Sequence, residues 1–278
     1  MDIKKQTILI TGCSTGIGYR AAVMLKEQGY RVIASARNLD DVAALIEEGF
    51  EAVQLDLADS KSIIKAVELV TEMTGGTLDA LFNNGAFGQA GAVEDLSREV
   101  LREQFETNFF GTHELTNLII PIMRAQGGGR IMYNSSVLGF VAMSYRGAYN
   151  ASKYALEGLV DTLRLELKGS NIHLSLIEPG PITSDFRKNA FAAYQRNIDS
   201  KHSVHKDTYQ AMEARLQKEG PAAPFTLPAD AVVEKVIHAL ESKRPKIRYY
   251  VTFPTYLFGY LKRILPARCL DYLLGKVQ

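Results

Sequence analysis

The sequence predicts an α/β fold, a doubly wound parallel sheet of about seven strands with helices on both faces. Short apolar runs alternate with longer stretches of helical spacing, the runs show little polar alternation, and a glycine-rich turn follows the first run. Alternating strands and helices are typical of parallel sheets, and unbroken apolar strands are expected where both faces are covered. The expected strands are 6–11, 30–35, 51–55, 78–82, 130–134, 172–177 and 247–251, and the expected helices are 17–28, 60–73, 97–123, 149–168 and one near 228–241.

Composition is that of an ordinary globular protein. The 278 residues are 46% hydrophobic and carry a net charge of +1, which suits one domain, 1–278, and gives no basic stripe for nucleic acid. Two cysteines, Cys13 and Cys269, are too few for a disulfide framework. The segment Met1–Gln6 leaves no room for a signal peptide, and no apolar run reaches the roughly 18 residues of a membrane span. We therefore expect a cytoplasmic protein without a transmembrane segment.

One long stretch, residues 183–226, falls outside the strand–helix alternation. Its aromatic and large apolar residues, set among polar ones, are Phe186, Phe191, Tyr194, Tyr209, Met212 and Phe225. Long insertions in compact domains are usually lids or binding loops, so we predict a substrate lid. The close pair His202 and His205 has no apparent carboxylate or cysteine company in this stretch, and no metal site is expected.

The turn after the first strand predicts a site for a dinucleotide. It reads Thr11-Gly12-Cys13-Ser14-Thr15-Gly16-Ile17-Gly18 and opens the first helix. Glycines let the backbone approach a pyrophosphate closely, and the helix N-terminus supplies amide donors and positive potential. We expect Gly12, Ser14, Thr15, Gly16, Ile17 and Gly18 to bind the cofactor.

The end of the second strand indicates which dinucleotide is bound. An acidic residue about 20 positions past the glycines would hold the ribose 2′-hydroxyl of NAD, but the chain has Ala36 followed by Arg37. A guanidinium can pair with a 2′-phosphate, so we predict NADP(H). Asp56 and Leu57 follow the third strand, where Asp56 is placed either to accept from the adenine amino group or to cap a helix.

Tyr149 and Lys153 form the centre of the expected catalytic group. Four positions apart at the start of a helix, they share one face and can reach the same cleft. Ser136 lies thirteen positions before Tyr149 (149 − 136), at the end of the fifth strand. Asn108 lies between aromatic residues in a helix, where asparagine is unfavourable by propensity and suggests a specific role.

Together these motifs resemble the short-chain dehydrogenase/reductase family, a Rossmann fold, from about residue 5 to 185. The matching elements are the glycine turn, Asn83-Asn84-Gly85-Ala86, Asn108, Ser136, Tyr149, Lys153 and Pro179-Gly180. The resemblance implies that Tyr149 exchanges the substrate proton, Ser136 orients the substrate oxygen, and Lys153 holds the nicotinamide ribose. It further implies that Asn108 holds a water linking Lys153 to solvent.

The same resemblance implies further cofactor contacts. Asn83 and Gly85 would lie beside the cofactor, and Pro179, Gly180, Ile182 and Thr183 would border the nicotinamide. The family usually reads Asn-Asn-Ala-Gly where this chain has Gly85-Ala86 in the last two places. Both residues are small, so we expect close backbone approach to the cofactor to survive this exchange.

The chemistry is coherent from the residues alone. A phenol with a pKa near 10 is a poor base at neutral pH. A cation about 4 Å away lowers that pKa by about three units at an effective dielectric constant of about 20. We therefore expect Lys153 to lower the pKa of Tyr149 towards neutrality.

Several functions remain open within this chemistry. The resemblance is strongest to hydroxysteroid and retinol dehydrogenases and bacterial aldehyde reductases, which implies a hydrophobic alcohol or carbonyl substrate, reduced in the cell. One alternative is a 3-ketoacyl or polyketide ketoreductase, although residues 183–226 are mixed in charge. Another is a catalytically idle NADP(H)-binding regulator, which would not need Ser136, Tyr149 and Lys153 together. We also expect a homo-oligomer, a dimer or a tetramer.

The C-terminal extension, 252–277, is predicted to form two short amphipathic helices that begin near Pro254 and Pro266 and stop near Gly275. Apolar residues recur at helical spacing in both, at 257, 261, 264 and 265 and at 270, 273 and 274. The favoured interpretation is packing on the core or on a second subunit. Basic residues predominate from 243 to 278, so the alternative is a weak, salt-sensitive peripheral contact with anionic lipid.

Overall fold

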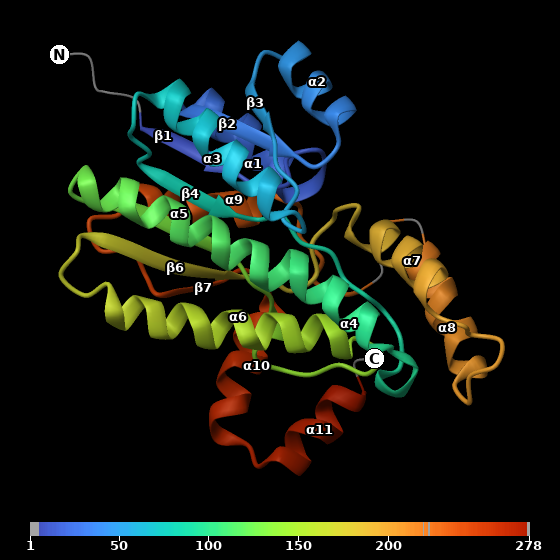
Figure 1. Cartoon of the computed structure of the whole chain (residues 1–278). Coiled ribbons are helices and arrows are strands. Elements are labelled where there is room, and N and C mark those ends of the chain that lie inside the picture. Colours follow the sequence, from blue (N-terminus) through green and yellow to red (C-terminus); the bar gives the residue numbers. More distant parts are fainter. Residues whose placement is uncertain (1–5, 219, 222, 277–278) are drawn as a thin grey trace.

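The expected strands form one seven-stranded parallel sheet in the computed structural model, which describes residues 6–218, 220–221 and 223–276 (Figure 1). The strands are β1 (Thr7–Ile10), β2 (Arg31–Ala36), β3 (Glu51–Gln54), β4 (Ala80–Asn83), β5 (Gly129–Asn134), β6 (Ile172–Glu178) and β7 (Arg248–Tyr250). The described residues leave out 219 and 222 of the expected lid, 277 of the C-terminal extension, and 1–5 and 278 of the expected domain.

The strand order β3-β2-β1-β4-β5-β6-β7 reverses direction between β1 and β4. In doubly wound sheets the ligand crevice lies at this reversal, outside the carboxyl ends of the strands. Three helices cover each face of the sheet. α1 (Gly16–Glu27), α2 (Leu39–Glu47) and α9 (Asp230–Glu241) lie on one face, and α3 (Ser60–Thr74), α5 (Thr112–Ala125) and α6 (Gly147–Glu166) lie on the other.

Residues of β1 show why its sequence is apolar without alternation. Ile8 and Ile10 pack against the α1 layer, whereas Leu9 packs against the α3 layer, and all three are fully buried. Successive side chains of a strand point to opposite faces, so covering both faces requires apolar residues at every position. The doubly wound parallel sheet predicted from the sequence is therefore confirmed.

The expected helix 97–123 consists of three joined segments. α4 (Arg98–Phe105) passes into a π-helical turn, η2 (Glu106–Gly111), and then into α5. Such turns are rare and occur frequently at functional sites. Gly111, at the end of this turn, allows close approach, because a Cβ there would lie 1.8 Å from the carbonyl oxygen of Leu57. The π-helical turn therefore holds the helix against the loop after β3.

The stretch expected to be a lid contains two helices, α7 (Phe186–Asn197) and α8 (Lys206–Gln217), which lie together at one end of the sheet (Figure 1). Tyr194 and Tyr209 are almost fully buried in a separate apolar cluster there. The Tyr209 hydroxyl accepts from the Ala92 amide at 2.9 Å and donates to Asp95. These contacts anchor the helix pair to the segment before α4, which includes the short helix η1 (Val93–Asp95).

The C-terminal extension forms the two predicted helices, α10 (Phe253–Ile264) and α11 (Ala267–Gly275), with Pro254 in the first turn of α10. Phe258 and Leu274 face inward and are buried in the cluster that contains Tyr149. Leu257 and Ile264 belong to the same periodic pattern but are exposed. Packing on the core therefore accounts for only one side of α10. No helix among the described residues is long and apolar enough to cross a membrane.

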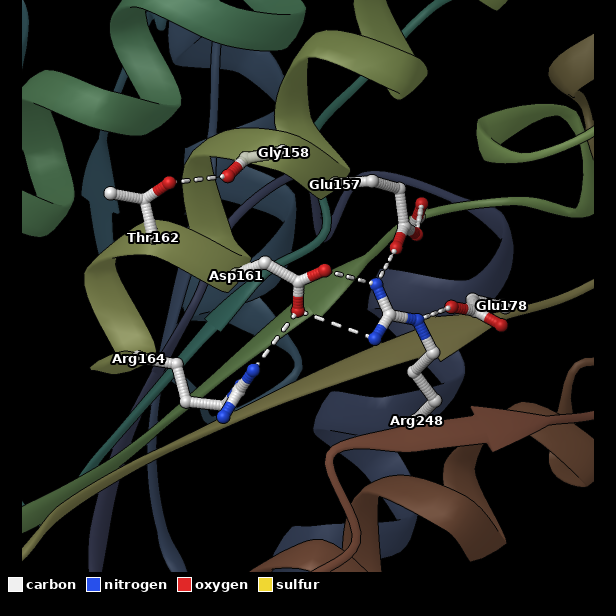
Figure 2. Close-up of polar contacts among 8 residues, drawn as sticks. Glu157, Gly158, Asp161, Thr162, Arg164, Glu178 and Arg248 are labelled. Carbon is white, nitrogen blue, oxygen red and sulfur yellow. Dashed lines mark hydrogen bonds and ion pairs between the residues drawn. The ribbon is translucent and has the colours of Figure 1, made fainter. Parts of the chain in front are cut away.

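Arg248 on the short strand β7 joins α6 to the edge of the sheet (Figure 2). Its guanidinium donates to Glu157 Oε2 at 2.9 Å and to Asp161 Oδ2 at 2.7 Å. Its Nε also lies 3.0 Å from Glu178 Oε1, close enough for an ion pair but without hydrogen-bond geometry. One cation thus faces three carboxyl groups from α6 and β6.

The Glu178 side chain is fully buried, and neither of its carboxyl oxygens accepts a hydrogen bond within the described part of the chain. Burial, and next the negative charge of Glu157, raise the pKa of Glu178 to about 9. Burial also raises the pKa of Glu157, against the opposing effect of hydrogen bonds from Ser135 and Arg248. At neutral pH Glu178 is therefore protonated in the folded chain.

We predict that Glu178→Gln becomes progressively more favourable for stability as pH rises. In the unfolded chain Glu178 loses its proton at its ordinary pKa of about 4.3, whereas in the folded chain it keeps the proton up to about 9. Stability contributed by this group is present below the lower pKa and is lost as pH rises towards the higher one. Glutamine cannot ionise, so the difference in free energy of unfolding, variant minus wild type, should increase between about pH 5 and pH 9.

Urea unfolding at several pH values measures this difference. Glu166→Gln, at an exposed position at the end of α6, is the matched control and should give a difference independent of pH. A pH-independent difference for Glu178→Gln as well would mean that Glu178 is ionised in the folded protein.

Candidate active site

The glycine turn after β1 forms a close-packed cradle at the carboxyl edge of the sheet. Gly12 has φ +70°, a left-handed conformation that favours glycine. A Cβ on Gly18 would lie 2.0 Å from the carbonyl oxygen of Gly12, so the turn and the start of α1 leave no room for a side chain. Ser14 and Thr15 are exposed on its outer side. The backbone at this turn is therefore accessible to a ligand.

Hydrogen bonds join this turn to the loop after β4. Thr11 Oγ1 accepts from the backbone amides of Asn84 and Gly85, at 2.9 and 2.8 Å. Asn84 Nδ2 donates to the carbonyl oxygens of Thr11 and Gly12, at 2.9 and 3.1 Å. A Cβ on Gly12 would lie 2.9 Å from Gly85 Cα. The two loops are thus in close contact, although this chain has Gly85 where the family usually has alanine.

Asn84 is the side chain that sequence analysis missed at this position. The predicted Asn83 side chain is buried and donates to Thr116 Oγ1 at 3.1 Å, facing α5 rather than the glycine turn. From the sequence, either side chain of the Asn83-Asn84 dipeptide could face the glycine turn, because successive side chains of a strand point to opposite faces. Only the backbone of Asn83 remains a candidate for cofactor contact.

The ends of β2 and β3 carry the other predicted cofactor residues. Arg37 is exposed directly after β2, and the Cys13 amide donates to the Ser35 carbonyl oxygen at 2.8 Å, which keeps the glycine turn beside β2. Asp56 Oδ1 accepts from the Ala58 amide at 2.9 Å, whereas the capping carboxylate of α3 belongs to Asp59. Asp56 therefore closes a turn and does not cap the helix.

The arrangement fits a phosphorylated dinucleotide. Helix α1 starts at Gly16 with no acidic residue in its first turn, so its free amide groups face no carboxylate on the same turn. Anions bind readily at such helix N-termini. The glycine cradle, which a Cβ would fill, and the exposed guanidinium of Arg37 supply a backbone surface and a cation for phosphate groups.

The predicted catalytic residues come together behind this cradle. Tyr149, Lys153 and Ser136 are 8%, 3% and 8% exposed. Lys153 Nζ lies 5.7 Å from the centroid of the Tyr149 ring and donates to the Asn134 carbonyl oxygen at 2.6 Å. Ser136 begins the short helix η3 (Val137–Gly139), where its Oγ accepts from the Leu138 amide at 3.1 Å. The three side chains thus come from the end of β5 and the start of α6.

Burial controls the protonation of this group. It raises the pKa of Tyr149 to about 12, and the adjacent Ser136 hydroxyl opposes the rise only in part. Burial also lowers the pKa of Lys153 to about 8, partly offset by Glu157 one helical turn away. The lowering of the Tyr149 pKa by Lys153 that the sequence suggested is not found. Loss of hydration is the dominant effect, and the phenol holds its proton at neutral pH.

Asn108 lies in the π-helical turn and is buried. Its Oδ1 accepts from the Phe87 amide at 3.1 Å, and its Nδ2 donates to the Phe87 carbonyl oxygen at 2.9 Å and to Ser152 Oγ at 3.2 Å. These contacts give the side chain a positioning role, and its expected water-holding role stays a prediction. Asn108 fixes the loop after β4 against Ser152, the residue before Lys153.

The segment expected to border the nicotinamide runs from the end of β6 to the lid. The Pro179 carbonyl oxygen accepts from the Val137 amide at 2.8 Å, which ties this segment to the Ser136 loop. The Thr183 amide donates to the Leu227 carbonyl oxygen at 2.9 Å, and Ile182 forms a bridge with Leu227. A Cβ on Gly180 would lie 2.2 Å from Thr252 Oγ1. The segment is thus held firmly on both sides.

Apolar side chains surround Tyr149. The Phe186 ring, at the start of the lid, lies 5.2 Å from the Tyr149 ring, centroid to centroid. The buried members of this cluster are Leu138, Val141, Phe258 and Leu274, and Val137, Phe140, Met143, Leu261, Leu270 and Leu273 pack against them. Helices α7, α10 and α11 therefore bring apolar surface to the reacting hydroxyl.

The lid histidines do have carboxylate partners, contrary to the expectation from sequence. His202 Nδ1 lies 2.7 Å from Asp199 Oδ2, and His205 Nε2 lies 2.5 Å from Glu94 Oε1. Within the described residues, no group of three or more histidine, cysteine, aspartate or glutamate side chains could hold a metal ion. The His205–Glu94 contact joins the lid to the segment before α4, whereas the His202–Asp199 contact lies within the lid.

Comparison with known proteins agrees with this geometry. The family model for short chain dehydrogenases matches residues 6–195. The uncharacterized oxidoreductase YbbO of Escherichia coli K12 is 42% identical over 272 residues, 98% of this chain and 95% of the relative. Human 17-beta-hydroxysteroid dehydrogenase type 1 is 33% identical, over 89% of this chain and 78% of the relative. A short-chain dehydrogenase structure from Streptomyces avermitilis covers 100% of this chain and 98% of its own, with a TM-score of 0.76 at 25% identity. This chain therefore belongs to the short-chain dehydrogenase/reductase family of oxidoreductases.

Proposed function

We propose that this chain is a single-domain, NADP(H)-dependent oxidoreductase that interconverts a hydrophobic alcohol and its carbonyl compound, steroid- or retinoid-like, and acts mainly as a reductase. The observation that carries the proposal is the burial of Tyr149 with Ser136 and Lys153 among apolar side chains. A polar group that exchanges a proton is thereby set in surroundings suited to an apolar substrate. The similarity to a hydroxysteroid dehydrogenase supports the same substrate class.

The residues of this chain have distinct roles in the proposed reaction. When bound, the nicotinamide supplies or accepts the hydride. Tyr149, whose pKa of about 12 keeps its hydroxyl protonated, donates that proton to the carbonyl oxygen of the substrate. Ser136 orients the same oxygen, and Lys153 holds the nicotinamide ribose. A protonated phenol can supply the proton that reduction of the carbonyl group requires.

Cofactor contacts follow the cradle described above. The diphosphate and the adjacent ribose would be held by Gly12, Ser14, Thr15, Gly16, Ile17 and Gly18. The adenosine would lie near Leu57, Gly85 and the Asn83 backbone. The nicotinamide would lie near Pro179, Gly180, Ile182 and Thr183. Asp56 keeps one carboxylate oxygen engaged in its own turn. The cytoplasmic location and the homo-oligomeric state, a dimer or a tetramer, stay predictions of the sequence.

Two alternatives remain, a 3-ketoacyl or polyketide ketoreductase and an idle NADP(H)-binding regulator. The ketoreductase would act on another class of substrate, and the regulator would turn over no substrate. NADPH consumption against a panel of aldehydes, steroids, retinal and acyl ketones separates them. Fastest turnover of acyl ketones would favour the ketoreductase, and binding of NADPH without turnover of any compound would favour the regulator.

Arg37→Ala should weaken NADPH binding far more than NADH binding. The guanidinium and Ser14 are both exposed beside the cradle, where two charge-assisted hydrogen bonds to a 2′-phosphate would contribute about 3 kcal/mol, roughly a hundredfold in affinity. Fluorescence titration with each cofactor measures the effect. Arg244→Ala, at an exposed arginine in the loop before β7, is the control. Equal affinity of the unaltered protein for NADPH and NADH would overturn the NADP assignment.

Tyr149→Phe should lower turnover by at least about two orders of magnitude while NADPH affinity stays nearly unchanged. Phenylalanine keeps the ring contact with Phe186 and loses only the hydroxyl that carries the proton. Tyr154→Phe, at a position 40% exposed on the same helix, should retain activity. Steady-state rates together with cofactor titration give both quantities.

Lys153→Met should behave differently from Tyr149→Phe. Lysine serves the ribose as well as the catalytic group, so we expect both lower turnover and weaker NADPH binding. If Tyr149→Phe keeps substantial activity, another residue supplies the proton and the roles assigned to this helix are wrong.

A further inference from the structure

The outward side of α10 is apolar and largely exposed in the described part of the chain. Its exposed residues are Phe253, Tyr256, Leu257, Tyr260 and Ile264, which are 55%, 43%, 40%, 60% and 74% exposed. At about 100° per residue they fall within an arc of about 100° on the helix surface. Phe225, 58% exposed at the end of the lid, extends this surface, with its ring centroid 4.9 Å from that of Phe253. We call these six residues the α10 patch.

The opposite side of the same helix is already occupied by the core. Thr255, Phe258 and Gly259 are buried, and Phe258 packs in the Tyr149 cluster. Figure 1 shows α10 and α11 beyond α6, away from the sheet. A broad apolar side of a helix is normally buried against another surface. Large exposed apolar patches mark interaction sites, and no segment among the described residues covers the α10 patch, so we look for its partner outside them.

Charge indicates the nature of that partner. The two C-terminal helices carry exposed basic residues at Lys262, Arg263, Arg268 and Lys276, against a single acidic residue, Asp271. The whole chain has a net charge of only +1, so positive charge is concentrated in the two C-terminal helices. Arg263 adjoins the patch, whereas Lys262 lies on the opposite side of α10, with its Nζ 4.8 Å from the centroid of the Tyr154 ring. A second copy of the chain meeting this surface about a two-fold axis would bring the same basic residues together, and like charges oppose such a contact. An anionic surface is complementary to it.

We propose that the α10 patch binds the surface of an anionic lipid membrane. Phenylalanine, leucine and isoleucine would enter the boundary between headgroups and acyl chains, and the tyrosine rings would keep their hydroxyls at the headgroups. Arg263, beside the patch, would contact anionic headgroups. The helix lies on the membrane and does not span it.

Membrane contact on this side would place the reaction centre close to lipid. The patch and the Tyr149 cluster lie on opposite sides of one helix, whose diameter with side chains is about 10 Å. The lid contributes both Phe186 to the Tyr149 cluster and Phe225 to the patch. Resting on the proposed function, the inference is that a hydrophobic substrate reaches Tyr149 from the bilayer.

Sedimentation with vesicles tests membrane binding without measuring activity. The full chain is mixed with vesicles of equal parts phosphatidylcholine and phosphatidylserine, or of phosphatidylcholine alone, at low and high salt. We expect pelleting with the anionic vesicles at low salt and several-fold less in the other conditions. Absence of pelleting with anionic vesicles, or pelleting that is equal in all conditions, would overturn the proposal.

Variants show whether the patch is responsible. Ile264→Ser should lower the partition coefficient about tenfold, since it removes one large apolar side chain from the lipid boundary. Arg263→Ala should lower it about fivefold, and only at low salt. Val204→Ser, which changes an apolar residue 84% exposed on the lid, is the control and should leave it unchanged. Unaltered partitioning of Ile264→Ser would contradict the assignment to α10.

Two further measurements separate this proposal from its rivals. If analytical ultracentrifugation without lipid reveals an oligomer that Ile264→Ser dissociates, the patch is an interface between copies and the membrane proposal is wrong. Tyr149→Phe should bind vesicles as the unaltered chain does. If the unaltered chain binds vesicles but turns over no compound of the panel, only the proposed enzymatic function is refuted. If it turns over a compound but does not bind vesicles, only the membrane proposal is refuted.

Discussion

The hydroxyl of Thr11 accepts hydrogen bonds from two consecutive amides, those of Asn84 and Gly85, and so joins the ends of β1 and β4. The Asn84 side chain extends this link in both directions. Its amide group donates to the glycine turn, and its Oδ1 accepts from Asn134 Nδ2 at 2.9 Å. The Asn134 carbonyl oxygen in turn accepts from Lys153. One hydrogen-bonded path thus runs from the glycine turn to Lys153, the proposed catalytic lysine, across the point where the strand order reverses.

The catalytic helix is held from its other side by charge. Arg248 reaches Glu157 and Asp161 on α6 and Glu178 at the end of β6. Glu178 immediately precedes Pro179, and Ser135, which precedes Ser136, donates to Glu157. The three segments that carry Ser136, Lys153 and the nicotinamide border therefore meet at one buried cluster. Removing one partner from such a cluster leaves an uncompensated buried charge, so its members constrain one another's positions more than they add stability.

Local patterns in the sequence predict much of the fold and of the candidate site. The strands are apolar because both faces of the sheet are covered, and the catalytic positions follow from the matched spacing of Ser136, Tyr149 and Lys153. Features that depend on distant contacts could not be predicted. The carboxylates around Arg248 are up to 91 positions away in the chain, and the choice between Asn83 and Asn84 depends on which neighbour each side chain meets. The pKa of Tyr149 differs from the one expected from the sequence because it is set mainly by burial, which no local pattern reveals.

Periodicity also fails to distinguish the two sides of α10. Leu257, Leu261 and Ile264 belong to one apolar pattern in the sequence, yet Leu261 packs in the Tyr149 cluster and the other two are exposed. A pattern with apolar residues on most of the helix surface indicates burial without showing what covers each side. The fold resolves one side, because α10 must close the apolar surroundings of Tyr149. In the described part of the chain, the basic residues of α10 and α11 form no ion pair with the core. Contacts within the fold therefore do not explain why so many basic residues lie here. The two sides of α10 thus have separate causes, one set by folding and the other by a surface that the chain meets only after it has folded.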